Sequence, residues 1–225
     1  MSAFTNETNY YSRKFECGWS LRAEDPVAIA ARVQALARRL GDLEPAYGEM
    51  WPLLAARAIR PGRDPGPVLE MSAEDLGALI DRRARFDPPR YPHPVGKEGY
   101  NLFLSANRNR YDTLCIDMGV SAGVYGDGAN RNRADIGLHN ESPVSRDPEL
   151  ALRVLYSLVE TLGAQWACAR AYIQPEGGAG DDSRRPWLAW SAAGLEAPPF
   201  PFSDEEAGPP AEVRSERGGD LLIWP

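Results

Sequence analysis

The sequence of 225 residues has few of the side chains that most often carry metal or acid–base chemistry. It contains two histidines, His93 and His139, and three widely separated cysteines, Cys17, Cys115 and Cys168. Because no Cys-x-x-Cys pair is present, zinc binding and thioredoxin-type exchange are not expected. Each cysteine lies within an apolar stretch, so we expect buried free thiols in a reducing compartment and no cofactor.

Long apolar runs and an excess of positive charge are also missing. No run approaches the roughly 20 residues that a membrane helix needs, and the first residues lack the basic and then apolar order of a secretory leader. The net charge of −7 argues against nucleic acid as a ligand, because phosphates require clustered lysine and arginine. We expect a cytoplasmic protein without membrane contact. The acidity suits a basic protein partner, and it equally suits an ordinary dispersed protein.

The sequence does contain enough apolar residues for one substantial core, at 43% of the chain. The length predicts a single domain over residues 1–225. Period-two patterns cluster in runs, with helical patterns between the runs, and this order predicts an α+β fold. We expect a mainly antiparallel β-sheet with amphipathic helices packed on one face.

The strand patterns differ in clarity. The first, from Tyr11 to Leu21, alternates apolar and polar residues, with Arg13 interrupting the apolar face so that this end is expected to be exposed. The three strands that follow in the middle of the chain predict an antiparallel meander, with a tight turn at residues 126–130. Strands are predicted over residues 11–21, 100–104, 114–125, 134–138, 165–173, 186–191 and 221–224.

Four segments repeat apolar residues at helical spacing. Two begin with an aspartate and a proline, Asp25-Pro26 and Asp147-Pro148, which suit the N-cap and the first helical position. A third is capped by Ser72. A shorter helix is expected over residues 45–58, and irregular surface over residues 197–210.

Two groups of residues could indicate an enzyme, and each also has a purely structural explanation. The first is a metal site. Asp117 and Asp135 lie opposite the apolar positions of neighbouring strands, and with His139 and Glu141 they could offer ligands to Mg²⁺ on the other sheet face. Alternating acids are also common on any solvent-exposed sheet face, and only their sign and register support the metal.

The second enzymatic interpretation is a serine hydrolase. Residues 119–123 read Gly-Val-Ser-Ala-Gly, which has the spacing of a nucleophile elbow around Ser121. An elbow requires a sharp strand-to-helix turn, whereas Ser121 lies in an alternating strand, and only His93 or His139 could act as the base. We assign no catalytic residue and expect a binding protein, with a metal-dependent or serine hydrolase as the alternative.

Short motifs along the chain follow a recognisable order. They are Gly18-Trp19, Arg22-Ala23-Glu24, Pro45, Trp51, Ala73-Glu74-Asp75-Leu76, Arg108 to Asp112, Gly123-Val124-Tyr125, Pro186-Trp187-Leu188-Ala189-Trp190 and Arg217-Gly218-Gly219-Asp220-Leu221-Leu222. In this order the chain resembles the immunity protein 52 family of bacterial polymorphic toxin systems. The resemblance extends over nearly the whole sequence and carries no catalytic residues with it.

The resemblance implies a role. Such proteins bind a cognate secreted toxin and protect the producing cell, and the toxins are often nucleases of type VI or contact-dependent systems. A nuclease has a basic surface, which an acidic inhibitor complements. We expect acids to steer the encounter and aromatic rings to anchor it, although the acidic loops could also be plain solvated surface whose phenylalanines pack onto the core. The expected contact residues are Asp127, Glu141, Asp181, Asp182, Trp187, Phe200, Phe202, Asp204, Glu205 and Glu206.

Overall fold

A computed structural model gives the fold of the chain. It describes residues 11–52, 66–85, 98–106, 117–124, 131–138, 142, 144, 147–173, 183–196 and 200–224. None of the helices within these residues is long and apolar enough to cross a membrane.

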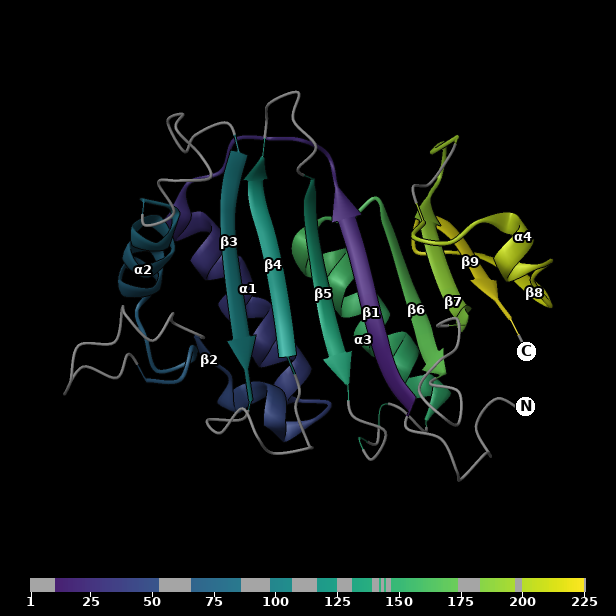
Figure 1. The fold of residues 1–225 in the computed structure, drawn as a ribbon, viewed down its shortest axis with the longest axis horizontal. Coiled ribbons are helices and arrows are strands. Elements are labelled where there is room, and N and C mark those ends of the chain that lie inside the picture. Colours follow the sequence, from purple (N-terminus) through teal and green to yellow (C-terminus); the bar gives the residue numbers. More distant parts are fainter. Residues whose placement is uncertain are drawn as a thin grey trace.

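Strands of the described residues form one antiparallel sheet. They are β1 (Tyr11–Trp19), β2 (Trp51–Pro52), β3 (Glu98–Ser105), β4 (Asp117–Val124), β5 (Asn132–Leu138), β6 (Trp166–Ile173), β7 (Ser183–Ala192), β8 (Glu212–Glu216) and β9 (Gly219–Ile223). Their order across the sheet is β2-β3-β4-β5-β1-β6-β7-β9-β8 (Figure 1). The predicted meander is confirmed in β3, β4 and β5, which pair in sequence.

The first strand lies in the middle of the sheet. On one side β1 pairs with β5, and on the other with β6. Its predicted alternation is confirmed up to Trp19, because Phe15, Cys17 and Trp19 are buried while Lys14 and Glu16 share the opposite face with their partners on β5. The predicted continuation to Leu21 is wrong, since β1 ends at Trp19 and Leu21 is 43% exposed. The expected exposure of Arg13 is wrong. Its side chain lies over the ring of Trp187, with the guanidinium carbon 4.8 Å from the ring centroid, and the residue is only 9% exposed.

Helices cover one face of the sheet, as predicted. Behind the strands in Figure 1 lie α1 (Pro26–Gly41) and α3 (Pro148–Leu162), while α2 (Ala73–Arg85) packs against α1 beside the β3 end of the sheet. The predicted caps are present. Asp25 accepts a hydrogen bond from the amide of Val27 at 2.8 Å, and Asp147 accepts one from the amide of Glu149 at 2.9 Å.

Two segments differ from the prediction. Residues 45–49 form a 3₁₀ helix, η1 (Pro45–Glu49), and the chain then turns into β2. The predicted helix over 45–58 is therefore wrong where it is described, because Pro52 cannot donate a helical hydrogen bond. The segment over 197–210, expected to be irregular, contains a short helix, α4 (Asp204–Ala207).

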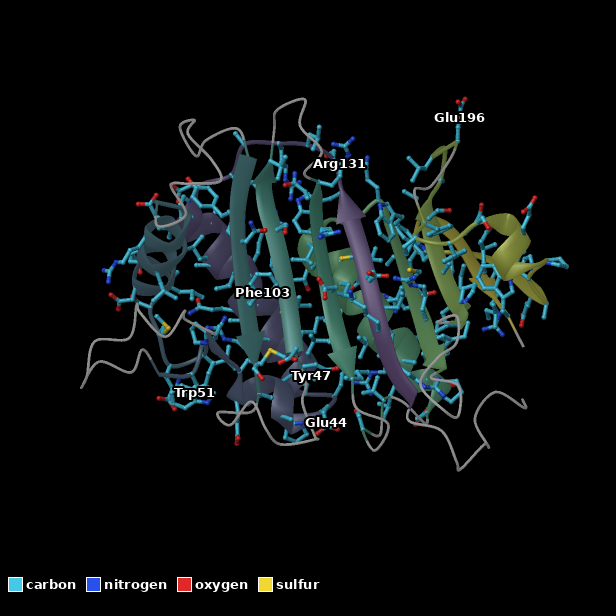
Figure 2. All side chains as sticks on the ribbon, in the orientation of Figure 1. Glu44, Tyr47, Trp51, Phe103, Arg131 and Glu196 are labelled. Carbon is cyan, nitrogen blue, oxygen red and sulfur yellow. The ribbon has the colours of Figure 1, made fainter. Side chains whose placement is uncertain are left out.

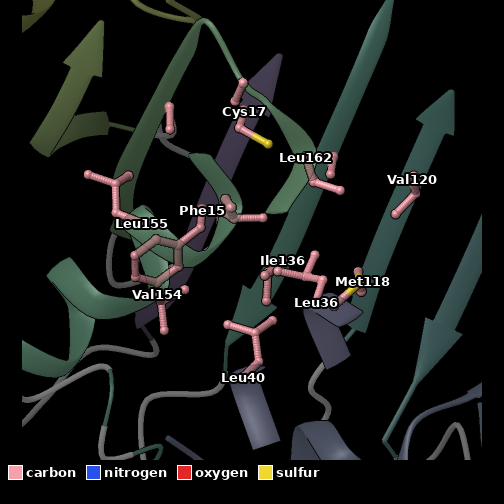
Figure 3. Packing of buried hydrophobic residues seen from close by; sticks show 14 of the residues in the cluster. Phe15, Cys17, Leu36, Leu40, Met118, Val120, Ile136, Val154, Leu155 and Leu162 are labelled. Atoms are coloured by element: carbon pink, nitrogen blue, oxygen red, sulfur yellow. The ribbon is translucent and has the colours of Figure 1, made fainter. Parts of the chain in front are cut away.

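One hydrophobic core lies between the sheet and its helices (Figure 3). Phe15 and Ile136 from the sheet meet Leu36 of α1 and Leu155 of α3, and the same cluster reaches Leu221 in β9. Two of the predicted buried free thiols, Cys17 and Cys168, are confirmed, whereas Cys115 lies outside the described residues.

A candidate partner-binding face

The face of the sheet that points away from α1 and α3 is the candidate site. Strands β3, β4, β5 and β1 present it toward the viewer in Figures 1 and 2, and none of the described helices lies across it. We call it the open face. Its residues, identified from strand register and burial, are Lys14, Glu16, Asn101, Phe103, Asp117, Gly119, Ser121, Arg133, Asp135 and Gly137.

The largest side chain of the open face is Phe103, which is 47% exposed (Figure 2). Its strand partner is Gly119, and Gly119 is in turn paired with Asp135 on β5. A Cβ atom at Gly119 would lie 3.4 Å from the Phe103 ring and 2.7 Å from an oxygen of Asp135. The glycine thus lets an aromatic ring and a carboxylate lean toward each other across β4.

Asp117 and Asp135 do share this face, as the strand pattern predicted. Asp117 pairs with Gly137 and Asp135 with Gly119, so the two acids occupy diagonal positions on adjacent strands. Asp135 is bound by Lys14, whose Nζ lies 3.3 Å from its Oδ2. Within the described part of the chain no group of three His, Cys, Asp or Glu is placed to hold a metal ion. His139 and Glu141, the other predicted ligands, lie outside it.

Ser121 lies in the middle of the open face and not at an elbow. It belongs to β4, which pairs with β3 on one side and β5 on the other. Its hydroxyl donates a hydrogen bond of 2.6 Å to Oδ1 of Asn101, its cross-strand neighbour. A nucleophile elbow places its serine at a strand-to-helix turn, so the motif occurs here in a different structural context. Both histidines lie outside the described residues.

A chain of ion pairs crosses from the open face to β6. Lys14 lies 3.2 Å from Glu16, and Glu16 also binds the guanidinium of Arg170. Arg170 is almost completely buried, and it donates a second hydrogen bond of 3.3 Å to the carbonyl of Pro201. Opposite charges therefore balance one another at this border, and the carboxylate of Asp117 stays exposed on the far side of β5.

Phe200 and Phe202, two of the predicted anchors, pack back onto the sheet. Their rings are stacked at 5.1 Å, and they contact Trp166 at 6.1 Å and Trp224 at 5.8 Å between centroids. Trp166 lies on the same side of the sheet as the open face, since it pairs with Gly18 of β1. The aromatic cluster therefore covers this side of the sheet next to the open face, and the two phenylalanines pack on the side opposite the hydrophobic core.

The remaining predicted contact residues are distributed as follows. Trp187 is 7% exposed and packs edge-on against Phe15 in the core, so it does not fit the predicted role of an exposed anchor. Asp204, Glu205 and Glu206 make up most of α4, and Glu205 is exposed there. Asp127, Glu141, Asp181 and Asp182 lie outside the described residues.

Chemically, the two buried thiols are unsuited to nucleophilic attack. Burial raises the pKa of Cys17 to about 12 and also raises that of Cys168, so both stay protonated near neutral pH. The open face offers instead an exposed ring, hydrogen-bonding side chains and carboxylates, which are typical components of a protein interface. No protein family model matches the chain, and no curated protein is significantly similar to it.

Proposed function

We propose that this protein is a cytoplasmic immunity protein that binds one secreted bacterial toxin and blocks it, and that the toxin docks on the open face. The observation that carries the proposal is Phe103, a large aromatic ring 47% exposed on a sheet face that none of the described helices covers. The order of motifs that resembles the immunity protein 52 family supports the class of partner.

An exposed ring on a flat sheet suits the centre of an interface. Aromatic residues dominate interface energetics where neighbouring groups exclude water from them. Around Phe103 the neighbours are short, because Gly119 is its strand partner and Asn101 and Ser121 lie one pair further along. A partner side chain can therefore approach the ring closely.

Charge supports a basic partner. The chain carries a net charge of −7, and Asp117 adds an exposed carboxylate to the open face. The exposed Glu205 of α4 lies further along the same sheet. A nuclease toxin presents lysine and arginine where it binds phosphates, so acidic groups would speed its association with the inhibitor.

The test is co-expression of the protein with the product of the adjacent upstream gene, followed by co-purification and a growth rescue assay. We expect a stable complex that restores growth. Phe103→Ala should weaken the complex by about 2 kcal/mol, roughly thirtyfold in the dissociation constant, as truncation of an aromatic anchor does.

The matched control is Leu21→Ala. Leu21 is 43% exposed, similar to Phe103, but it lies in the connection between β1 and α1. Its truncation should leave the dissociation constant within about twofold of the wild type, since isolated exposed apolar residues contribute little. Failure to form any complex would contradict the immunity function. If the two variants change the dissociation constant to the same extent, Phe103 is not an anchor and the interface lies away from the open face.

A further inference from the structure

The two edges of the sheet differ in how they are protected against pairing. At one edge, β2 is two residues long and ends in Pro52, which has no amide hydrogen to offer a further strand. At the other, β8 is a regular strand of five residues, and β9 is its only neighbour among the described strands. Residues 212–215 are all exposed, and Val213 is 57% exposed. β8 contains no proline, and its protection against pairing rests on the charged side chains of Glu212, Arg214 and Glu216.

The hairpin turn determines which backbone groups of β8 point outward. Arg217 and Gly218 have φ angles of 53° and 74°, as in a two-residue type I′ turn, and Glu216 and Gly219 form the closing pair. A closing pair exchanges both hydrogen bonds, and the pairs alternate from there. Residues 212, 214 and 216 therefore bond to β9, while Val213 and Ser215 direct their N–H and C=O groups to the free edge.

The side chains of β8 are self-complementary in one antiparallel register. Glu212 and Arg214 lie on the same side of the strand, where the guanidinium donates hydrogen bonds of 2.6 and 3.0 Å to the carboxylate. When two copies of β8 pair about a two-fold axis through Val213, Glu212 of each copy stands opposite Arg214 of the other. The two Val213 residues then exchange main-chain hydrogen bonds and cover each other.

The two registers with the axis moved to Arg214 or Ser215 are less favourable than the register centred on Val213. Centring the axis on Arg214 places the two guanidiniums opposite each other and Glu212 opposite Glu216, and like charges directly across strands are destabilising. Centring it on Ser215 would pair Arg214 with Glu216, which already accepts a hydrogen bond from the hydroxyl of Tyr156. Charge therefore disfavours the register centred on Arg214, and the hydrogen bond from Tyr156 to Glu216 disfavours the register centred on Ser215.

We propose that β8 is a homodimerisation edge, at which a second copy of this chain pairs antiparallel about Val213 and joins the two sheets into one. Such an interface is isologous, so each copy offers the same strand to the other. It is small, and we expect a dimer that forms at high protein concentration. The edge lies at the end of the sheet opposite β2 and β3, so the dimer leaves the open face accessible.

The experiment is sedimentation velocity of the full chain over a concentration series from low to high micromolar. The wild type should shift from monomer to dimer. Glu212→Lys and Arg214→Glu should each raise the dimer dissociation constant at least about tenfold, because each places like charges across the pair. The double variant Glu212→Arg with Arg214→Glu should restore dimerisation, since it exchanges the two charges. Val213→Pro should abolish it, because proline removes the amide hydrogen that the pairing uses.

The control is Glu196→Lys, a charge reversal of another exposed residue, located after β7 (Figure 2). It should dimerise like the wild type. A wild type that stays monomeric at every concentration would overturn the proposal. So would single variants that dimerise normally. Tighter dimerisation of Glu212→Lys would overturn the register, because it would place Glu212 opposite Glu216. None of these outcomes depends on toxin binding.

Discussion

Two tyrosines on the helix-covered side of the sheet differ in the hydrogen bonding of their hydroxyl groups. Tyr47 in η1 is completely buried, and in the described structure its hydroxyl has no hydrogen-bond partner. Burial, together with the nearby Glu44, raises the pKa of Tyr47 far above its ordinary value. The hydroxyl of Tyr156 instead donates a hydrogen bond to Glu216. A buried polar group without a partner destabilises a fold, whereas a bonded one stabilises it.

Tyr47→Phe should raise the free energy of unfolding by about 1 kcal/mol, because it removes a desolvated hydroxyl and keeps the ring. Tyr156→Phe makes the same chemical change and should lower it by about 1–2 kcal/mol, since it removes a bond to a charged acceptor. Urea denaturation of the two variants beside the wild type measures both. Equal destabilisation by the two changes would show that Tyr47 has a hydrogen-bond partner in solution.

Cys17 should make the protein less stable in alkali. Burial raises its pKa from 9.0 to about 12, so the unfolded chain loses this proton at lower pH than the folded one. Stability is fully present below about pH 9 and falls as pH rises toward 12, by up to about 1.4 kcal/mol per pH unit for this group. Denaturation midpoints at pH 8 to about 11 would measure the slope, which Cys17→Ala should reduce.

Cys168 and Tyr47 contribute in the same direction, because burial raises the pKa of each. The slope of the Cys17→Ala variant should therefore be reduced but not abolished. Identical slopes for variant and wild type would mean that the Cys17 thiol titrates normally in the folded protein.

At the scale of elements, the close contact between α1 and α2 depends on a glycine, Gly77, which has no side chain. A Cβ atom at Gly77 of α2 would lie 2.9 Å from Cα of Val27 in α1 and 3.0 Å from its nitrogen. Glycine weakens a helix interior, but here it allows two helix backbones to approach. From the sequence alone Gly77 is only a glycine within a helical pattern. The packing of α2 against Val27 explains why a larger residue does not fit there.

Gly77→Ala should lower the free energy of unfolding by about 1–2 kcal/mol, because overpacking outweighs the gain in helix propensity. Gly48→Ala is the control, since a Cβ there would meet only Leu69 Cδ1 at 4.0 Å. It should change stability by less than about 0.5 kcal/mol. Thermal melts of both variants provide the comparison. A stabilised Gly77→Ala variant would mean that α1 and α2 can separate without loss.

Local chemistry explains which elements the sequence could predict. Asp25 and Asp147 begin their helices through side-chain contacts two residues away, so neighbouring residues suffice to predict them. Strand β8 escaped prediction because its residues are exposed and mostly polar, and pairing with β9 alone makes it a strand. The segment after Pro45 has apolar spacing that fits a helix, but Trp51 pairs with Ser105 of β3 and so belongs to the sheet.

The open face could be predicted only in part. Alternation along β3 and β4 already separates Phe103 and Asp117 from the apolar positions. The packing of α1 and α3 decides which face of the sheet stays uncovered by these helices. This packing cannot be predicted from a local sequence pattern. The prediction of Trp187 as an anchor failed for the same reason, since its burial comes from contact with Phe15 on a strand far away in sequence.

At the scale of the whole molecule, one core connects distant strands. Trp19 of β1 and Trp190 of β7 belong to the same buried cluster as Leu102 of β3. We therefore expect a single cooperative unfolding transition, with tryptophan fluorescence and far-ultraviolet circular dichroism coinciding across a denaturant series. Two separated transitions would divide the chain into more than one folding unit.

The central place of β1 has a consequence for synthesis on the ribosome. Both neighbours of β1 are made much later, and the second, β6, ends at Ile173. At ordinary elongation rates of roughly 5–20 residues per second, the two edges of β1 remain without their partner strands for on the order of ten seconds. A ribosome that stalls between Leu138 and Trp166 holds a chain in which β1 can pair with β5 but has no β6 on its other edge. We therefore expect one edge of β1 to stay unpaired, and open to chaperones, until β6 has been made.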